Sequence, residues 1–222
     1  MKDLIVFGTG KIAACMTHYF ERDSAFRIHA YTCDREFVQA AEFQGRPALP
    51  FDEIQKHYPP ESYVMFVALG YQRVNRLRKA KYLEAKERGY SLVSYVSPKV
   101  EGSFVLGDNC AVMDGAVIQP FAEFDNDVFV WGGAMVGHHA RIGSHCWITG
   151  SANIGGSVEL QEGSFVGLNA TIGQEVRVGR NCVLGANSLS TRDVPADSVV
   201  VVRDTELHRL KTDQFIRLSS CF

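Results

Sequence analysis

The sequence of 222 residues lacks any apolar run that approaches the ~20 residues of a membrane-spanning helix. It also lacks a cluster of basic residues of the kind that binds nucleic acid, and its formal net charge is only −2. The chain opens with a predicted strand instead of a charged and apolar signal segment. We therefore expect a cytoplasmic protein with no membrane span and no nucleic-acid partner.

Cysteine occurs at only six positions, and no two of them form a CxxC pair. The missing motif argues against a metal or redox site and favours reduced thiols that mostly pack in the core. Hydrophobic residues make up 46% of the chain, which is enough to bury a substantial core. The cysteines are Cys15, Cys33, Cys110, Cys146, Cys182 and Cys221.

A six-residue repeat dominates the C-terminal half. Large apolar residues occupy every sixth position from Val100 to Leu184; many are followed by glycine, and the residue four places on is mostly small. A hexapeptide period predicts a parallel β-helix, in which three units close one triangular coil of about 18 residues. We expect about five coils between residues 100 and 189, with no inserted loop. At the corners we expect glycine to relax a backbone with unusual φ.

The repeat also predicts where three of the cysteines lie. Cys110, Cys146 and Cys182 follow one another at intervals of 36 residues, so they share one interior column with two coils between neighbours. Two coils span roughly 10 Å. A disulfide needs Cα atoms within about 7 Å, so we expect these thiols to remain free.

Residues 1–97 show a different pattern, with predicted strands alternating with predicted helices. The alternation favours a small parallel, Rossmann-like sheet. We expect the β-helix to occupy residues 98–202, and residues 203–222 to cap it through a short amphipathic helix at 204–218. The expected strands of the first domain are residues 3–8, 26–32, 63–69 and 91–96, and its helices are residues 11–22 and 72–88.

Two of these strands end in glycine turns that are suited to an anion. Gly8 and Gly10 form a GxGxxA turn, and Lys11 opens the helix that follows. Asp34 follows the second strand, in place for a ribose hydroxyl. Gly70 ends the third strand, ahead of a basic stretch that includes Arg78. Three interpretations stay open, namely a nucleotide-diphosphate site such as that of a nucleotide sugar, an NAD site, and a turn without ligand.

The chain resembles a known family in several stretches at once. These are the GxGxxA start, residues 68–70 ahead of residues 75–78, residues 94–98, the coils, residues 136–143 and residues 190–195. Together they resemble the sugar acyltransferases grouped with the sialic acid O-acetyltransferases, to which the N-acetyltransferase of the bacillosamine pathway is related. The resemblance implies a left-handed β-helix, a homotrimer, and an active site between neighbouring prisms.

The resemblance also implies the reactants. Acetyl-CoA, or another acyl-CoA, is expected as a co-substrate, with no permanently bound cofactor and no metal. The expected acceptor is a UDP- or dTDP-linked amino sugar, or a sialic-acid-like sugar. In the first case the nucleotide lies on the N-terminal domain.

Acyl transfer needs a base that takes the proton of the acceptor, and histidine suits that task. His138 matches the base position of the family, and His139 beside it is the alternative catalytic residue. In the six-residue register both lie on an outward corner. His145 lies one strand further on, at the next corner, and is either substrate-binding or structural.

Three positions depart from the family pattern. His139 stands where relatives often have a carboxylate that orients the base, Trp147 where many have a histidine near the thioester, and Trp131 where an asparagine is common. The two tryptophans either shape the acceptor pocket or pack the trimer interface.

The donor is expected on the last coils. The amide of Gly150 is a candidate oxyanion donor. Glycines from Gly167 to Gly185 are expected to leave one smooth corner for the pantetheine arm, and Arg192 to meet a phosphate of CoA. The residues expected at the donor are Trp147, Gly150, Gly167, Gly185 and Arg192.

The favoured function is acetyl transfer to a nucleotide-linked amino sugar in bacterial surface-glycan biosynthesis. O-acetylation of a sugar hydroxyl is the first alternative. A metalloenzyme like the γ-carbonic anhydrases is disfavoured, because that family needs a further histidine where this chain has Gly143. A non-catalytic nucleotide-sugar-binding protein is the third alternative.

Overall fold

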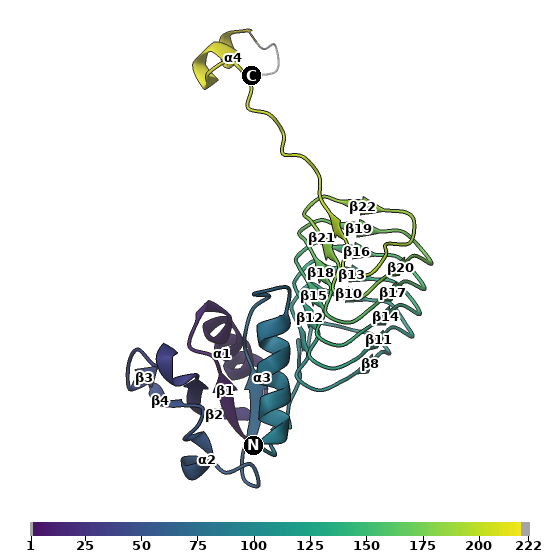
Figure 1. Cartoon of the computed structure of the whole chain (residues 1–222). Helices are drawn as coiled ribbons and strands as arrows, with labels where there is room; N and C mark the ends of the chain where they lie inside the picture. Colours follow the sequence, from purple (N-terminus) through teal and green to yellow (C-terminus); the bar gives the residue numbers. More distant parts are fainter. Residues whose placement is uncertain (1, 219–222) are drawn as a thin grey trace.

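The computed structural model describes residues 2–218, which form an α/β domain, a triangular prism of short strands and a C-terminal extension (Figure 1). The α/β domain lies against the lower part of the prism, and the extension leaves from the opposite end. Both predicted architectures are therefore present, in the predicted order.

The N-terminal sheet has the strand order β3-β4-β2-β1-β5-β6, and every neighbouring pair is parallel except β3 with β4. Its centre is β1, whose residues Leu4 to Phe7 are at most 2% exposed, as expected for a strand covered on both faces. The strands β3, β4 and the helix α2 were not predicted. The strands are β1 (Lys2–Phe7), β2 (Phe26–Cys33), β3 (Glu42–Phe43), β4 (Arg46–Pro50), β5 (Val64–Val67) and β6 (Ser91–Leu92). The helices are α1 (Lys11–Asp23), η1 (Arg35–Phe37), α2 (Ile54–His57) and α3 (Arg76–Glu87).

The predicted strand at residues 91–96 is two strands that belong to different domains. β6 pairs with β5 in the N-terminal sheet, whereas β7 (Tyr95–Val96) pairs with β9 in the prism. The single-strand prediction was wrong because the apolar pattern continues through the turn at residues 93–94. The two domains are consequently joined without a linker.

The prism consists of three parallel sheets, in which each two-residue strand pairs with the strand 18 residues later, except that β7 and β9, and β21 and β23, are 16 residues apart. The six-residue spacing runs without interruption from β8 to β22, as the repeat predicts. The first sheet holds β7, β9 (Ala111–Val112), β12 (Phe129–Val130), β15 (Trp147–Ile148), β18 (Phe165–Val166), β21 (Val183–Leu184) and β23 (Val199–Val200). The second holds β10 (Val117–Ile118), β13 (Met135–Val136), β16 (Asn153–Ile154), β19 (Thr171–Ile172) and β22 (Leu189–Ser190). The third holds β8 (Val105–Leu106), β11 (Glu123–Phe124), β14 (Arg141–Ile142), β17 (Glu159–Leu160) and β20 (Arg177–Val178).

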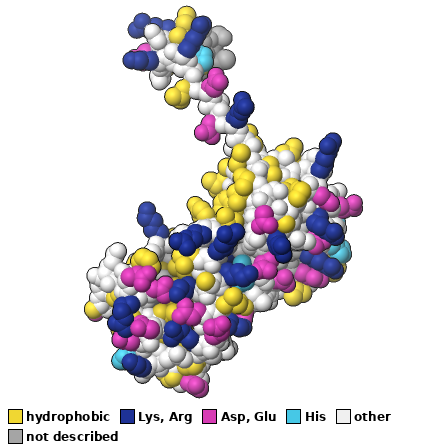
Figure 2. All heavy atoms as spheres, viewed as in Figure 1, with side chains coloured by type: hydrophobic (Ala, Val, Ile, Leu, Met, Phe, Trp, Pro, Cys, Tyr) yellow, Lys and Arg dark blue, Asp and Glu magenta, His cyan; other side chains and the backbone are white. Residues whose placement is uncertain are grey.

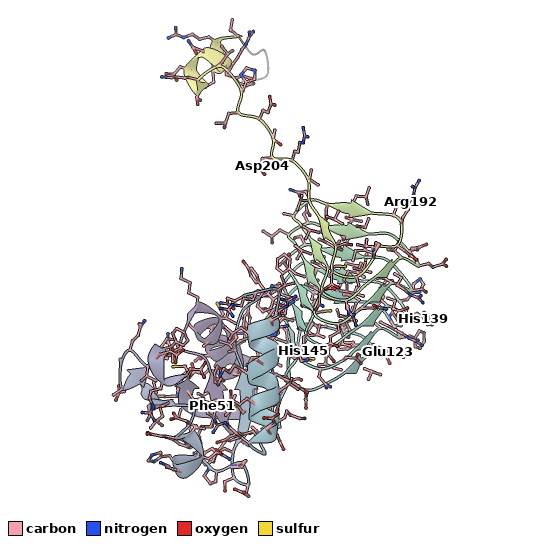
Figure 3. All side chains as sticks on the ribbon, in the orientation of Figure 1. Phe51, Glu123, His139, His145, Arg192 and Asp204 are labelled. Atoms are coloured by element: carbon pink, nitrogen blue, oxygen red, sulfur yellow. The ribbon has the colours of Figure 1, made fainter. Side chains whose placement is uncertain are left out.

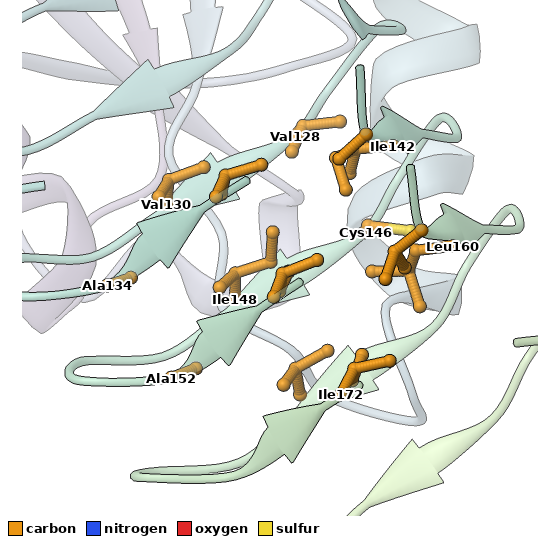
Figure 4. Close-up of a cluster of buried hydrophobic side chains, with 14 of the residues drawn as sticks. Val128, Val130, Ala134, Ile142, Cys146, Ile148, Ala152, Leu160 and Ile172 are labelled. Atoms are coloured by element: carbon orange, nitrogen blue, oxygen red, sulfur yellow. The ribbon is translucent and has the colours of Figure 1, made fainter. Parts of the chain in front are cut away.

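Large and small side chains stack in separate columns inside the prism. Figure 4 shows Val130 and Ile148 in one column and Ala134 and Ala152 in another. All four are fully buried. Each new coil repeats the same packing, so the apolar residues of the repeat stabilise the prism along its whole length.

The repeated glycines serve a different purpose from the one expected. They do not adopt positive φ; that conformation belongs to the residue two places later, for example His139 at +57° and His145 at +63°. A Cβ on Gly137 or Gly155 would lie 2.5 to 2.7 Å from a backbone nitrogen of the next coil. These glycines are required because successive coils approach closely at the corner, not because φ is unusual.

The cysteine predictions are confirmed for the described residues. Cys110, Cys146 and Cys182 are free and fully buried, and Cys33 is also buried. Burial raises the pKa of the Cys146 thiol to about 12, so it remains protonated and unreactive. Cys15 is free and exposed, and Cys221 lies outside the described residues.

The C-terminal extension contains the predicted helix in shortened form. No residue of α4 (Thr212–Leu218) is buried, and Figure 1 shows the helix standing away from the last coil on an extended segment. It therefore does not cap the prism in this structure. Across residues 2–218, no helix combines the length and the apolar character needed to cross a membrane.

Candidate functional site

The two glycine turns lie against each other at one edge of the N-terminal sheet. Gly8 follows β1 with φ +128°, and a Cβ there would lie 2.8 Å from the carbonyl oxygen of Ala68. From β1 the sheet continues to β2 on one side and to β5 on the other, so the direction of the strand order changes between the two turns. Open α/β sheets bind ligands at that point. The structure thus brings the turn of Gly8 and Gly10 to the turn that contains Gly70.

The start of α1 is suited to an anion. Its N-cap residue is Gly10, which offers no capping side chain, and the first turn contains no acidic residue. A Cβ on Gly10 would meet no atom within 4 Å, so space is open beside these amides. Lys11 is exposed at the first helical position. Free helix amides and a nearby lysine favour a phosphate at this edge.

Asp34 lies at the end of β2, along the same sheet edge, but its carboxylate already has a partner. The Nζ atom of Lys81 lies 2.5 Å from Asp34 Oδ1 and 2.8 Å from a carboxylate oxygen of Glu84. These residues line a charged cavity of about 370 Å³ that also includes Arg35 and Arg88. A ribose hydroxyl at Asp34 would have to share the carboxylate with Lys81.

A second cavity, of about 490 Å³, opens between the N-terminal domain and the prism. Its walls are largely aromatic, with Tyr71 from the Gly70 turn facing Trp147 and Phe165 at ring-centroid distances of 5.5 and 4.8 Å. The Nε1–H of Trp131, also in the wall, is buried without a hydrogen-bond partner among the described residues. Ile12, next to the turn of Gly8 and Gly10, completes the wall on the side of the N-terminal domain. We name this cavity the aromatic pocket.

The aromatic pocket also collects residues that were expected at the donor. Trp147, Gly150 and Gly167 line it together with Trp131, which was expected at the acceptor. Figure 2 shows hydrophobic side chains gathered on the prism where it rises from the N-terminal domain, and Leu168 of the pocket is 60% exposed. The pocket is therefore an open apolar surface next to the sheet edge that carries the two glycine turns.

Arg78 does not lie at a ligand surface. It is fully buried, and its guanidinium Nε donates to both carboxylate oxygens of Asp127 at 3.0 Å. Its Nη2 also donates to the carbonyl oxygens of His145 and Cys146. All of these partners belong to the prism, so Arg78 joins α3 to the coils. The expected substrate contact of Arg78 is not supported, because its donors are used inside the protein.

His145 belongs to the same buried junction. It is 5% exposed, its Nδ1 lies 2.8 Å from Asp127 Oδ2, and its ring packs against Tyr82 of α3 at 5.2 Å. Asn109 donates to the Asp127 carboxylate as well, at 2.7 Å. Of the two roles considered for His145, the structure supports the structural one.

The turn between Gly70 and α3 is held in an unusual conformation. Arg73, Val74 and Asn75 have φ of +52°, +54° and +63°, which is a short left-handed helical turn of non-glycine residues. Such residues cost roughly 1–2 kcal/mol each. The Nδ2 of buried Asn75 donates to the carbonyl oxygens of Gly163 and Ser164 in the prism. These contacts hold the strained turn, and with it the neighbouring pocket residue Tyr71.

His138 and His139 lie on a different corner, between β13 and β14, whereas the N-terminal domain packs on the sheet of β12 and β15. Both are exposed, and Figure 3 shows His139 at the outer edge of the prism. The Nδ1 atoms of the two rings are 3.2 Å apart. The His138 ring covers Gly156 of the next coil, where a Cβ would lie 2.8 Å from its Nε2. Gln119 accepts a hydrogen bond from the His138 backbone N–H.

The expected glycine path for the pantetheine arm was wrong. Gly167 and Gly185 share one corner with Gly150, but Gly173 lies on the His138 corner and Gly179 on the corner of His145. Successive hexapeptides occupy successive corners, so glycines six residues apart cannot line one edge.

Arg192 lies on the His138 corner, three coils above His138 and therefore roughly 14 Å away along the prism. Figure 3 shows Arg192 and His139 on the same side of the prism. The expected donor residues are thus divided between two corners of one chain.

Several residues of the site were missed from the sequence. No role was predicted for Tyr71 or Asp127, and Asn75 lies within the predicted helix at residues 72–88, which in the structure begins only at Arg76. The only available signal for Asp127 was its register, since it precedes His145 by 18 residues and so lies directly beneath it. Among residues 2–218 no cluster of three potential metal ligands occurs within the chain.

Comparison with known proteins finds neither a matching family model nor a matching curated protein. Solved structures do match. PerB from Caulobacter crescentus, solved with CoA and GDP-perosamine, superposes with a TM-score of 0.78 at 24% identity, over 90% of this chain and 93% of PerB. The acetyltransferase domain of PglB from Neisseria gonorrhoeae FA1090 gives 0.77 at 23% identity, over 90% of this chain and 96% of that domain.

A third match is WeeI from Acinetobacter baumannii AYE, with a TM-score of 0.76 at 16% identity over 90% of this chain and 97% of WeeI. The PglB domain has also been solved with acetyl coenzyme A. All three likenesses span both domains. At these identities they establish the fold of the whole two-domain unit.

Proposed function

We propose that this protein transfers the acetyl group of acetyl-CoA to the amino group of a nucleotide-linked sugar, with His138 as the general base. The observation that carries the proposal is an exposed histidine whose Nε2 has no hydrogen-bond partner among the described residues, on a chain whose fold follows PerB over 90% of its length. PerB was solved with CoA and with a nucleotide amino sugar, GDP-perosamine.

The acceptor would lie along the carboxyl edge of the N-terminal sheet. The diphosphate meets the amides at the start of α1, and the sugar extends into the aromatic pocket next to Ile12 and Tyr71. An aromatic wall suits the apolar face of a sugar ring, and the unpartnered Nε1–H of Trp131 offers it a hydrogen bond. The proposal does not depend on which nucleobase the acceptor carries.

One chain does not complete this site, because His138 and the aromatic pocket lie on different corners. Both corners border the same sheet, that of β10, β13, β16, β19 and β22. The outward residues of that sheet are uncharged, with Val117 and Leu189 56% and 64% exposed. If this sheet faces a threefold axis, the His138 corner of each chain meets the pocket corner of the next. A head-to-tail contact of this kind closes into a ring, here a homotrimer of left-handed β-helices.

The chemistry then needs only this chain's residues and the thioester. The acceptor nitrogen attacks the acetyl carbonyl carbon, and His138 Nε2 takes the proton that the nitrogen loses. Collapse of the tetrahedral intermediate breaks the carbon–sulfur bond, and the CoA sulfur leaves with that proton. The donor would lie along the corner that carries His138, Gly156 and Arg192.

The test is release of CoA from acetyl-CoA with UDP-, dTDP- and GDP-linked 4-amino sugars, each beside its hydroxyl counterpart. His138→Ala should lower kcat by about 10²- to 10⁴-fold. His57→Ala, which removes an exposed histidine of the N-terminal domain, should leave the rate unchanged. Full activity of His138→Ala would contradict the assignment of His138 as the base. The absence of CoA release with every acceptor would contradict the proposed function itself.

Mixed oligomers test the shared site in the same assay. His138→Ala and Trp131→Ala are each expected to be impaired alone. Co-assembled, they form some contacts in which an intact His138 meets an intact pocket, so activity should partly return. No recovery in verified mixed oligomers would contradict a site built from two chains.

A further inference from the structure

His139 stands directly against the proposed base. Its Nδ1 lies 3.2 Å from His138 Nδ1, within hydrogen-bond reach, so one of the two nitrogens carries a hydrogen and the other accepts it. The other ring nitrogen of the exposed His138 is Nε2, which lies near Gly156 of the next coil and has no hydrogen-bond partner among the described residues. The contact therefore couples the presence of a hydrogen on His138 Nε2 to the presence of a hydrogen on His139 Nδ1.

Only one of the two possible arrangements leaves His138 able to act as a base. If His138 Nδ1–H donates to His139, Nε2 of His138 has a free lone pair that can take a proton. If His139 donates instead, a neutral His138 carries its hydrogen on Nε2 and can take no proton there. The ring nitrogen that bears the hydrogen is set by the partner of the other nitrogen.

We propose, on the basis of the proposed function, that His139 is a positioning residue that accepts the Nδ1–H hydrogen bond of His138 and holds it in the base-competent tautomer. A carboxylate in that place would also stabilise the imidazolium by its charge. A neutral imidazole accepts the same hydrogen bond without that charge. It performs the task only while its own Nδ1 is unprotonated.

The corner fixes His139 for this role. Its φ of +57° turns the side chain back toward His138, and its ring rests on Phe121 of the coil below, with centroids 4.9 Å apart. The residues stacked against this corner are Gln119, Pro120 and Phe121 below and Gly155, Gly156 and Ser157 above. None of these six is ionisable. The closest charged side chains along the chain are those of Glu123, Arg141 and Glu159, which lie in register on the adjoining sheet, where Arg141 pairs with Glu123.

During transfer the proton from the acceptor nitrogen reaches His138 Nε2, while the Nδ1–H of His138 stays hydrogen-bonded to His139 Nδ1. The departing CoA sulfur then removes the proton from Nε2. Both histidines return to their starting state, and no further reactant is needed.

Three variants at the same backbone position separate this role from a structural one. Glycine, asparagine and aspartate all tolerate positive φ, so none should disturb the corner. His139→Gly removes the acceptor and should lower kcat by about 10- to 100-fold with little change in KM. His139→Asn returns an acceptor oxygen and should recover most of the rate. His139→Asp adds a negative charge and should move the acidic fall of the pH–rate profile to higher pH.

The tautomer can be read without any substrate, from the ¹⁵N chemical shifts of the histidine rings. We expect the hydrogen on Nδ1 of His138 in the natural protein and its loss from Nδ1 in His139→Gly. A hydrogen on His138 Nε2 in the natural protein, or equal rates for the Gly and Asn variants, would overturn the proposal. Failure of His138→Ala to lose activity would instead count against the proposed function, whatever the tautomer.

Discussion

The prism carries two histidines in equivalent places with opposite surroundings. His139 and His145 are each the third residue of a corner, and both have positive φ, at +57° and +63°. His139 is exposed, and its ring contacts those of its neighbour His138 and of Phe121. His145 is 5% exposed and lies between Asp127 and Tyr82.

The difference comes from what covers each corner. The N-terminal domain seals the corner of His145, where Arg78 and Asp127 form a fully buried ion pair. Nothing in residues 2–218 of the same chain covers the corner of His138 and His139. A regular repeat thus fixes the backbone at each corner, and the N-terminal domain decides which corner is buried and which stays exposed.

The largest expected effect breaks the buried corner. Arg78→Ala leaves the Asp127 carboxylate buried with no cation, which should lower the free energy of unfolding by about 3–5 kcal/mol in denaturant titration. Arg76→Ala, an exposed arginine on the same helix, should change it by less than about 0.5 kcal/mol. If Arg78→Ala instead kept its stability and lost nucleotide-sugar affinity, Arg78 would be a ligand residue after all.

Much of this comparison was open to prediction from the sequence. The repeat alone predicted the uninterrupted coils, the buried column of Cys110, Cys146 and Cys182, and the outward corner of His138. These follow from register, because every residue of a regular prism has its place set by its position modulo 18. The same logic shows why glycines six residues apart could not form one edge.

What was missed depends on contacts between the domains. The left-handed turn that ends at Asn75 is stabilised by carbonyl groups 88 and 89 residues away, so local propensity predicts a helix there instead. The burial of Arg78 was missed for the same reason. A basic helix reads as a solvated or phosphate-binding face until the partner Asp127, 49 residues away, is known.

A smaller effect is expected at the open corner. Gly156→Ala would place a Cβ 2.8 Å from Cε1 and Nε2 of His138, so the ring must turn away from its position. We expect kcat to fall by about tenfold or more, while the melting temperature changes by less than about 2 °C because the ring can move into solvent. Ser157→Gly, which removes a neighbouring side chain and adds nothing beside the ring, is the matched control. A Gly156→Ala enzyme with normal kcat would show that the position of the His138 ring is not critical.

The smallest effect is expected on the charged sheet that separates the two corners. Arg177 pairs with Glu159 there at 2.9 Å, and both side chains are largely exposed. Hydrogen bonds from Gln161 and then Arg177 lower the pKa of Glu159. The pair should therefore stabilise the fold above the ordinary carboxyl pKa and lose that contribution as the pH falls and Glu159 is protonated. Because the pair is exposed, Arg177→Ala should lower the free energy of unfolding by at most about 0.5 kcal/mol at neutral pH and leave kcat unchanged.

A larger loss of stability, or one that depends on protein concentration, would show that this sheet is covered in the assembly. The sheet of β10 and β13 would then no longer be the best candidate to face the threefold axis.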